Sequence, residues 1–198
     1  MELTIFPHGK RIAILGVFRH PTPPPNGKAI GGLMKKIDVS TPRYPNVFAI
    51  VDDEDFIYLN EWNWNINSRG YAVRKFRNNE RRVQRYMHRD ILKPSTSQDV
   101  DHINGEKLDN RRENIRACSH TENMRNSKKP KSGLTSMFKG VIAYKGGKNK
   151  FRAVIRANGK AKHLGLFENE CDAARAYNMA ASKYYGEFAL LNKIEERA

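Results

Sequence analysis

The sequence predicts an α+β fold of small antiparallel sheets and short helices, and two observations predict it. Short runs of β-branched and aromatic residues recur between residues 48 and 167, and turn-forming residues such as those at 67–70 and 158–159 separate them. One longer segment, from about Glu170 to Tyr185, has alanines at positions that allow a helix to pack closely on a sheet. The C-terminal part is therefore expected to be a three-stranded antiparallel sheet packed on one helix.

The overall charge is the strongest constraint on the kind of partner. The 198 residues carry a formal net charge of +15, with 39% hydrophobic and 29% charged residues. A chain this basic is expected to bind a polyanion, and nucleic acid is the commonest one. The modest apolar content fits one or two small domains with much solvated surface.

Cysteine content and hydropathy exclude several classes of protein. Cys118 and Cys171 lie far apart and neither belongs to a Cys-x-x-Cys pair, which excludes a four-cysteine zinc site and a disulfide framework. We expect two reduced thiols and no zinc. The sequence has no run of 18 apolar residues and no signal-peptide pattern, so it predicts a soluble cytoplasmic protein without a membrane partner.

The first 83 residues divide into an extension and a small β-rich segment. Residues 1–33 include a proline-rich stretch with linker chemistry, and we expect a poorly defined extension there. Residues 34–83 are expected to form an accessory segment, with an apolar strand at 48–51 and a turn at 67–70. The acidic cluster at 52–55 is compatible with a metal site, but carboxylates are favoured at a helix N-terminus, and we adopt that interpretation.

Residues 74–89 form a strongly basic run with a single glutamate. Such a run is commonly a solvated face, but arginine also suits bidentate contact with phosphate. Because the run leads directly into the motif described next, we expect it to clamp a nucleic-acid backbone, chiefly through Arg81, Arg82 and Arg85. Three further arginines are expected to contact the backbone from the other side: Arg111, Arg112 and Arg116.

Asp101 and His102 stand together before a turn, and Asn114 and Asn123 follow within a short stretch. Hydrolysis of a phosphodiester needs a hard cation, which carboxylate and amide oxygens hold well, and a neutral imidazole that takes a proton from water. An Asp-His pair before Asn-Gly is by itself commonly only a turn. The two asparagines and the basic surroundings favour a site.

These residues carry a resemblance to a known family. The runs Met87-His88-Arg89, Val100-Asp101-His102-Ile103-Asn104-Gly105, Asn110-Arg111-Arg112-Glu113-Asn114-Ile115-Arg116 and Thr121-Glu122-Asn123 resemble the HNH endonucleases, in particular the homing branch whose last motif residue is Asn. The resemblance covers residues 84–126. It implies a ββα-metal nuclease core, in which two short strands and a helix surround one divalent ion.

The resemblance also implies roles for individual residues. Asp101 and Asn123 match the metal ligands, and His102 matches the general base. Asn114 matches the residue that holds the loop and orients His102. The role of His88 stays open between a core histidine and a DNA-facing one, and we expect it to support the site without acting directly. The implied cofactor is one Mg²⁺ or Mn²⁺ ion. The implied products carry a 3′ hydroxyl and a 5′ phosphate.

The segment that follows has an unusual charge balance. From residue 123 to residue 167 there is no Asp or Glu, so this stretch is purely basic. Residues 127–137 have the composition of a linker that can lie along phosphates, with Lys128 and Lys129 as contacts. Beyond it, alternation places Phe151, Ala153 and Ile155 on one face of the middle strand and arginines on the other.

Residues 138–192 resemble the DNA-binding domain of plant ethylene-response factors, the APETALA-two fold. The resemblance rests on Lys139-Gly140-Val141, His163-Leu164-Gly165-Leu166-Phe167, Ala173-Ala174-Arg175-Ala176-Tyr177 and Leu191-Asn192. It implies DNA contacts from five positions: Tyr144, Arg152, Val154, Arg156 and His163. We also expect Lys139 and Lys162 to contact DNA. Ile142 and Ala161 stand where plant members often have arginine, and His163 replaces tryptophan, so the target sequence does not carry over.

The sequence as a whole predicts a site-specific DNA endonuclease of homing type, with a second DNA-binding module that raises the effective concentration at the target. We expect a monomer that acts on double-stranded DNA in a phage-infected or bacterial cell, without a small-molecule cofactor. The main alternative is a non-catalytic DNA-binding regulator with a relict nuclease motif. An RNA-binding protein is disfavoured because the aromatic stacking pattern for single strands is missing.

Overall fold

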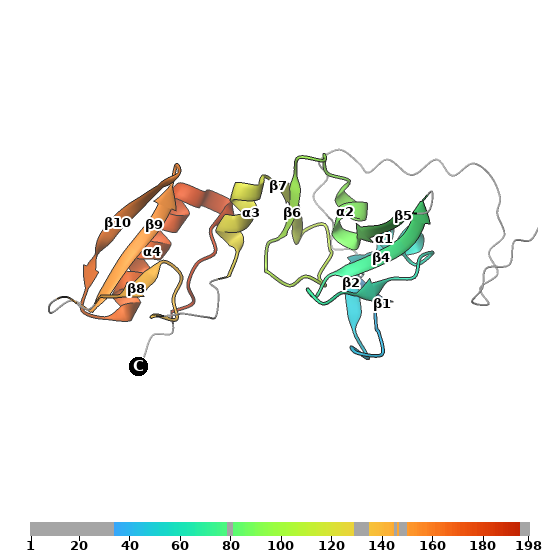
Figure 1. Cartoon of the computed structure of the whole chain (residues 1–198), viewed down its shortest axis with the longest axis horizontal. Helices are drawn as coiled ribbons and strands as arrows, with labels where there is room; N and C mark the ends of the chain where they lie inside the picture. The colour runs from blue at the N-terminus through green and yellow to red at the C-terminus, as the bar shows by residue number, and fades with distance from the viewer. Residues whose placement is uncertain (1–33, 79–80, 129–134, 145, 147–149, 195–198) are drawn as a thin grey trace, which may run out of the picture. The chain divides into compact units, whose positions relative to one another are not determined.

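The fold is described from a computed structural model that covers residues 34–78, 81–128, 135–144, 146 and 150–194 (Figure 1). The expected N-terminal extension and Lys129 lie outside these described residues. All the described residues belong to one of the two compact units into which the chain divides, Gly31–Ala198.

The first elements are a hairpin and a short helix. Strands β1 (Met34–Asp38) and β2 (Phe48–Asp52) pair antiparallel, and α1 (Asp53–Leu59) follows directly. Alternate strand residues are buried, as the period of two requires, and they include Ile37, Ala49 and Val51. The acidic residues at 53–55 form the first turn of α1, where the helix dipole favours negative charge.

A second sheet, in the order β3-β4-β5, carries the basic run. It consists of β3 (Asn65–Ile66), β4 (Ala72–Asn78) and β5 (Arg81–Tyr86), and α2 (Met87–Leu92) continues from its last strand. The core of this sheet is continuous with the core of β1 and β2, because Ala72 of β4 and Val51 of β2 belong to one buried cluster, together with Met87 of α2. The accessory segment and the motif segment therefore share a single hydrophobic core.

Two short strands and a helix form the segment that holds the motif. Strands β6 (Asp99–His102) and β7 (Ile115–Cys118) pair antiparallel, and α3 (His120–Asn126) follows them. Ser119 and Glu122 close a reciprocal capping box at the start of α3, which fixes where the helix begins. This order of elements is compatible with the expected nuclease fold.

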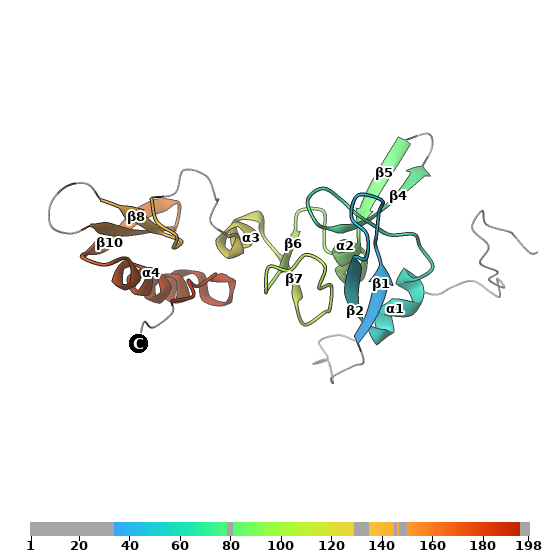
Figure 2. The same ribbon diagram turned by 90° about the horizontal axis from the view of Figure 1, so that it is seen from below.

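The C-terminal module is a three-stranded antiparallel sheet packed on one helix, as the sequence predicted. The strands β8 (Val141–Ala143), β9 (Phe151–Ala157) and β10 (Lys160–Phe167) have the order β10-β9-β8, and α4 (Glu170–Tyr185) is followed by a 3₁₀ turn, η1 (Gly186–Phe188). Figure 2 shows α4 along one face of this sheet. None of the described helices has the length and apolarity needed to cross a bilayer.

The register of β9 divides the module into a packed face and an open face. Ala153 and Ile155 are buried in the two clusters that contain α4 residues, whereas Arg152 and Arg156 are exposed. At Gly140 the backbone has φ +74°, and an added Cβ would lie 1.9 Å from the Tyr177 ring. Only glycine allows strand and helix to approach so closely there.

Candidate active site

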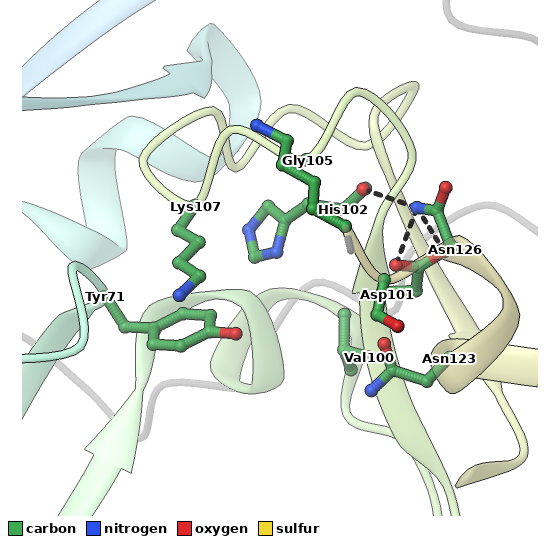
Figure 3. A pocket seen from close by; sticks show the side chains of 10 residues that line it. Tyr71, Val100, Asp101, His102, Gly105, Lys107, Asn123 and Asn126 are labelled. Atoms are coloured by element: carbon green, nitrogen blue, oxygen red, sulfur yellow. Dashed lines mark hydrogen bonds between the residues drawn. The ribbon is translucent and has the colours of Figure 1, made fainter. Parts of the chain in front are cut away.

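The β6–β7 hairpin places Asp101 and His102 side by side at the floor of a pocket of about 330 Å³. Each of these two residues is only 5% exposed. Figure 3 shows Asp101, Asn123 and Asn126 on one side of the pocket, Tyr71 and Lys107 on the other, and His102 between them. The hairpin and α3 therefore bring three of the four expected motif residues to one cavity.

The His102 ring is held by Asn110, a residue that sequence reasoning missed. Asn110 is fully buried, its Nδ2 donates to the Leu108 carbonyl, and its Oδ1 lies 3.4 Å from His102 Nε2. This arrangement assigns the proton to Nε2 and leaves Nδ1 as the basic nitrogen. Burial lowers the pKa of His102 below its usual value, so the ring is neutral at neutral pH.

His88 lies directly behind His102. The two rings meet edge to face at 5.1 Å, and the Tyr71 ring lies 5.3 Å from His88. Burial, together with His102, lowers the pKa of His88 to about 3, so it stays neutral. Its Nδ1 is buried and has no hydrogen-bond partner in the described part of the chain. These contacts give His88 a packing role beside His102.

Asp101 is fixed by two side chains that approach it from different elements. Arg116, its cross-strand partner, places Nη2 2.9 Å and Nε 3.1 Å from Oδ2. Asn126 donates Nδ2 to both carboxylate oxygens, at 2.9 and 3.0 Å, and to the His102 carbonyl at 3.0 Å. Asn126 was not predicted as a site residue, although it stands one helical turn after Asn123.

Asn123 lines the same pocket, with its amide orientation set by Asp99. Its Nδ2 donates to Asp99 Oδ2 at 3.1 Å, and His120 Nδ1 lies 3.0 Å from the same oxygen. These two hydrogen bonds lower the pKa of Asp99. Because Nδ2 is committed to Asp99, the amide oxygen is the Asn123 atom left for a ligand.

The donor atoms at this position fit a hard divalent cation. Three of the four hydrogen bonds from Arg116 and Asn126 converge on Asp101 Oδ2, and only one reaches Oδ1, so Oδ1 keeps a lone pair for a ligand. Within the described ranges, no group of three or more His, Cys, Asp or Glu is placed to hold a metal ion. A cation here would therefore rely on one carboxylate, one amide oxygen, water and phosphate, a set that Mg²⁺ accepts.

Asn114 organises the loop between the two strands. Its Oδ1 accepts from the Asn104 amide at 3.0 Å, and its Nδ2 donates to the Asp109 carbonyl at 2.8 Å. Its own carbonyl accepts from the Ile103 amide, next to His102. Asn114 thus holds the loop, while Asn110 Oδ1 accepts the hydrogen bond that the His102 ring donates.

Three arginines that we expected at the DNA surface have internal partners instead. Arg116 pairs with Asp101, Arg111 pairs with Asp109 at 2.7 Å and with Glu113, and Arg112 pairs with Asp55 and Glu54, each at 2.7 Å. The partner Asp55 is 2% exposed and lies 57 residues earlier, so no local pattern could reveal the pairing. These guanidinium groups stabilise the core and the site, and we do not assign them to DNA.

The arginines expected on β5 are exposed. Arg81, Arg82 and Arg85 all have exposed side chains, and Arg82 stands directly opposite Arg77 across the hairpin. Like charges in this position repel each other, which favours a polyanion as partner. Lys128, at the rim of the pocket, is also exposed and lies 3.7 Å from Glu106.

The residues expected on the C-terminal DNA face fall into two groups. Tyr144, Arg152, Arg156 and His163 are exposed, and the register places His163 opposite Val154 on the open face. Lys162 stands opposite the buried Ile155, and its Nζ lies 5.3 Å from the Tyr184 ring of α4. The structure therefore places Lys162 on the helix side of the sheet.

Lys139 also has an internal role. Its Nζ donates to the carbonyls of Arg125 and Ser127 at the end of α3, at 2.5 and 2.7 Å. Burial lowers the pKa of Lys139 to about 8. A cation at this end of a helix satisfies free carbonyls and complements the dipole. We therefore assign Lys139 to α3 and not to DNA.

A buried neutral histidine beside a carboxylate and an amide oxygen is an arrangement typical of hydrolytic sites. Comparisons with known proteins agree with this class. Residues 96–125 match a family model described as HNH endonuclease, and this segment contains β6, β7 and most of α3. The match indicates a nuclease activity.

A relative supports the same relationship over a longer stretch. An uncharacterized HNH endonuclease of Acanthamoeba polyphaga mimivirus is 28% identical over 155 residues, which cover 77% of this chain and 79% of the relative. No solved structure matches the chain.

Proposed function

We propose that this protein is a site-specific DNA endonuclease of the HNH homing type. The observation that carries the proposal is His102: it is buried, neutral, oriented by Asn110 and adjacent to Asp101 in a cavity that Asn123 also lines. The products are a 3′ hydroxyl and a 5′ phosphate. DNA is the substrate, in agreement with the family match and the net charge of +15.

The protein residues have the following roles in the reaction. His102 Nδ1 accepts a proton from a water molecule, whose oxygen forms a bond to phosphorus as the bond from phosphorus to the 3′ oxygen breaks. The 3′ oxygen takes a proton from solvent. Asp101 and Asn123 would hold one Mg²⁺ or Mn²⁺ ion, which supplies charge stabilisation at the phosphate. Asn126 and Arg116 keep the Asp101 carboxylate in place.

DNA binding is proposed to use two separate surfaces. Near the active site, Arg81, Arg82, Arg85 and Lys128 contact phosphates, and Lys129 follows Lys128 in the chain. In the C-terminal module, which resembles the APETALA-two fold, the open sheet face contributes Tyr144, Arg152, Arg156 and His163. Joining two weak surfaces raises the effective concentration at the target, so one chain can act as a monomer.

Cleavage of supercoiled plasmids that carry a library of genomic fragments tests the proposal. With Mg²⁺ or Mn²⁺ we expect relaxed or linear product from a defined subset of plasmids, and the sequenced ends give the target. His102→Ala is expected to lower the rate by about 100-fold or more, because a general base contributes about 10²- to 10⁴-fold. The variant must keep the wild-type melting temperature and DNA affinity for the loss to be assigned to chemistry.

The alternative function is a DNA-binding regulator, and the exposed arginine face of β9 is the observation that favours it. If the wild-type protein binds DNA specifically but cuts no plasmid of the library with either metal, the regulator is the better assignment. Relaxed circles as the final product would indicate nicking, whereas linear product would indicate a double-strand break.

A further inference from the structure

Tyr71 occupies the wall of the active-site pocket that faces Asp101 and Asn123. Figure 3 shows its ring reaching into the pocket from the side of Lys107, with the hydroxyl directed toward the Asp101 and Asn123 side. It comes from the loop between β3 and β4, a part of the chain outside the matched nuclease segment. Neither the motif nor the family match assigns this residue a role.

The backbone at Tyr71 is held rigidly by a short turn. Asn67 Oδ1 accepts hydrogen bonds from the Arg69 amide at 2.9 Å and from the Tyr71 amide at 3.0 Å. The Asn67 amide in turn donates to the Tyr71 carbonyl at 3.0 Å, and Gly70 adopts φ +83° to close the turn. This turn fixes the position of the Tyr71 backbone independently of any substrate.

The ring of Tyr71 is packed on three aromatic neighbours. Its centroid lies 5.7 Å from Tyr86, 5.3 Å from His88 and 6.0 Å from His102. Lys107 covers the ring with Nζ 4.6 Å from its centroid, and that Nζ also donates to the Arg69 carbonyl at 2.9 Å. The hydroxyl is therefore presented at one position and does not swing freely.

The hydroxyl has the properties of a hydrogen-bond donor that awaits an acceptor. Among the described residues, none forms a hydrogen bond with it, although the Tyr71 backbone is fully engaged. Burial, together with Tyr86 and Asp101, raises the pKa of Tyr71 above its usual value, so the phenol keeps its proton. A permanently protonated phenol can donate, but it cannot replace His102 as the base.

We propose that the Tyr71 hydroxyl donates a hydrogen bond to a non-bridging oxygen of the scissile phosphate and is a catalytic residue. The inference rests on the proposed endonuclease function. A phosphate bound between the two sides of the pocket would receive this hydrogen bond from the Tyr71 side, while Asp101 and Asn123, on the opposite side, would hold the cation that offsets its charge; His102 lies between the two sides. Negative charge on the non-bridging oxygens rises in the transition state, and a fixed donor aimed at them lowers the barrier.

The test uses Tyr71→Phe with Tyr86→Phe as the matched control. Each change removes one hydroxyl from the same aromatic group and keeps both rings, but only Tyr71 lines the pocket. On a duplex that contains the mapped target, Tyr71→Phe is expected to lower the single-turnover rate by about 10- to 100-fold at saturating enzyme. Its equilibrium affinity for DNA in Ca²⁺ should stay within about 2-fold of wild type, and Tyr86→Phe should cut at the wild-type rate.

Phosphorothioate substrates separate a direct contact from a structural role. Sulfur is a poorer acceptor than oxygen, so one diastereomer at the scissile phosphate should slow the wild-type protein, and this slowing should shrink in Tyr71→Phe. If Tyr71→Phe is slower than wild type but sulfur slows it as much as it slows the wild-type protein, for both diastereomers, the direct contact is overturned. A wild-type cleavage rate in Tyr71→Phe also overturns it. If the wild-type protein itself fails to cut, the endonuclease proposal fails, and this one fails with it.

Discussion

His88 shows how a buried neutral histidine makes folding depend on pH. Its pKa is lowered to about 3 in the folded protein, whereas an unfolded histidine titrates near 6.5. Above pH 6.5 both states are neutral at this position. As the pH falls from 6.5 toward 3, only the unfolded state takes the proton, so the folded state loses stability over that window.

Replacing His88 with Phe should remove this dependence. The wild-type protein is expected to lose up to about 1.4 kcal/mol of unfolding free energy per pH unit at this position between pH 6.5 and 3. The variant keeps an aromatic ring against His102 and Tyr71 but has no proton to gain. Denaturant unfolding at several pH values measures the difference, and parallel pH curves for the two proteins would contradict the assignment.

Asn126 and Asn123 provide a matched pair of substitutions within one helix. Asn126→Asp places a second carboxylate against both oxygens of the buried Asp101. We expect the free energy of unfolding to fall by about 3 kcal/mol or more. Asn123→Asp faces Asp99, whose side chain is 37% exposed, and water screens that repulsion to about 1 kcal/mol. Chemical denaturation compares the two variants, and equal losses would show that Asn126 does not carry the Asp101 contact.

At the scale of the element, α3 depends on its cap. Ser119→Ala removes the side chain that accepts from the Glu122 amide and bonds the Glu122 carboxylate, and caps of this kind contribute about 1 kcal/mol. Thr121→Ala, an exposed change in the same helix, is the control and should be neutral or slightly stabilising. Thermal melting should separate them by a few degrees. A larger decrease in melting temperature for Thr121→Ala than for Ser119→Ala would contradict the capping role.

The elements themselves were largely predictable, and their long-range partners were not. Alternation in β9, the turn at 158–159 and the small residues of α4 depend on local chemistry, so the sequence alone indicates the C-terminal sheet and helix. The ion pair between Arg112 and Asp55 spans 57 residues, and only tertiary packing selects it. The sequence also predicts DNA contacts for three basic residues that have internal partners in the structure: Arg111, Arg116 and Lys139. The local sequence around a basic side chain does not show which group it will pair with.

At the scale of the whole molecule, salt dependence tests the second DNA-binding surface. Each phosphate contact on duplex DNA contributes about 0.9 to the slope of log affinity against log salt. Replacing Arg152 and Arg156 with Ala should therefore lower that slope by about 2 and leave the saturated cleavage rate unchanged. Lys162→Ala is the control, because Lys162 lies on the helix side of the same sheet. A decrease in the salt slope as large as that of the arginine pair would contradict the assignment of the DNA-binding face.

The candidate site was predictable to the extent that its residues stand in one motif. Asp101, His102 and Asn123 are brought together by a hairpin and a helix within a short stretch of chain, and the motif indicates them. Tyr71 enters from the loop between β3 and β4, and its approach depends on how the sheet that carries this loop packs. Asn110 and Asn126 lie inside the motif segment, but asparagine is common in turns and helix ends, so nothing local separates them from loop residues.

Arg116 connects the motif segment to the turn that follows α4. One side of its guanidinium holds Asp101, while Nη1 donates to the Glu187 carbonyl at 2.9 Å and the Phe188 ring lies 3.9 Å from its central carbon. Residues that follow α4 thus help to position the Asp101 carboxylate. Exchange of the C-terminal module for another would therefore keep Asp101 in place only if the new module supplied a turn equivalent to Gly186–Phe188.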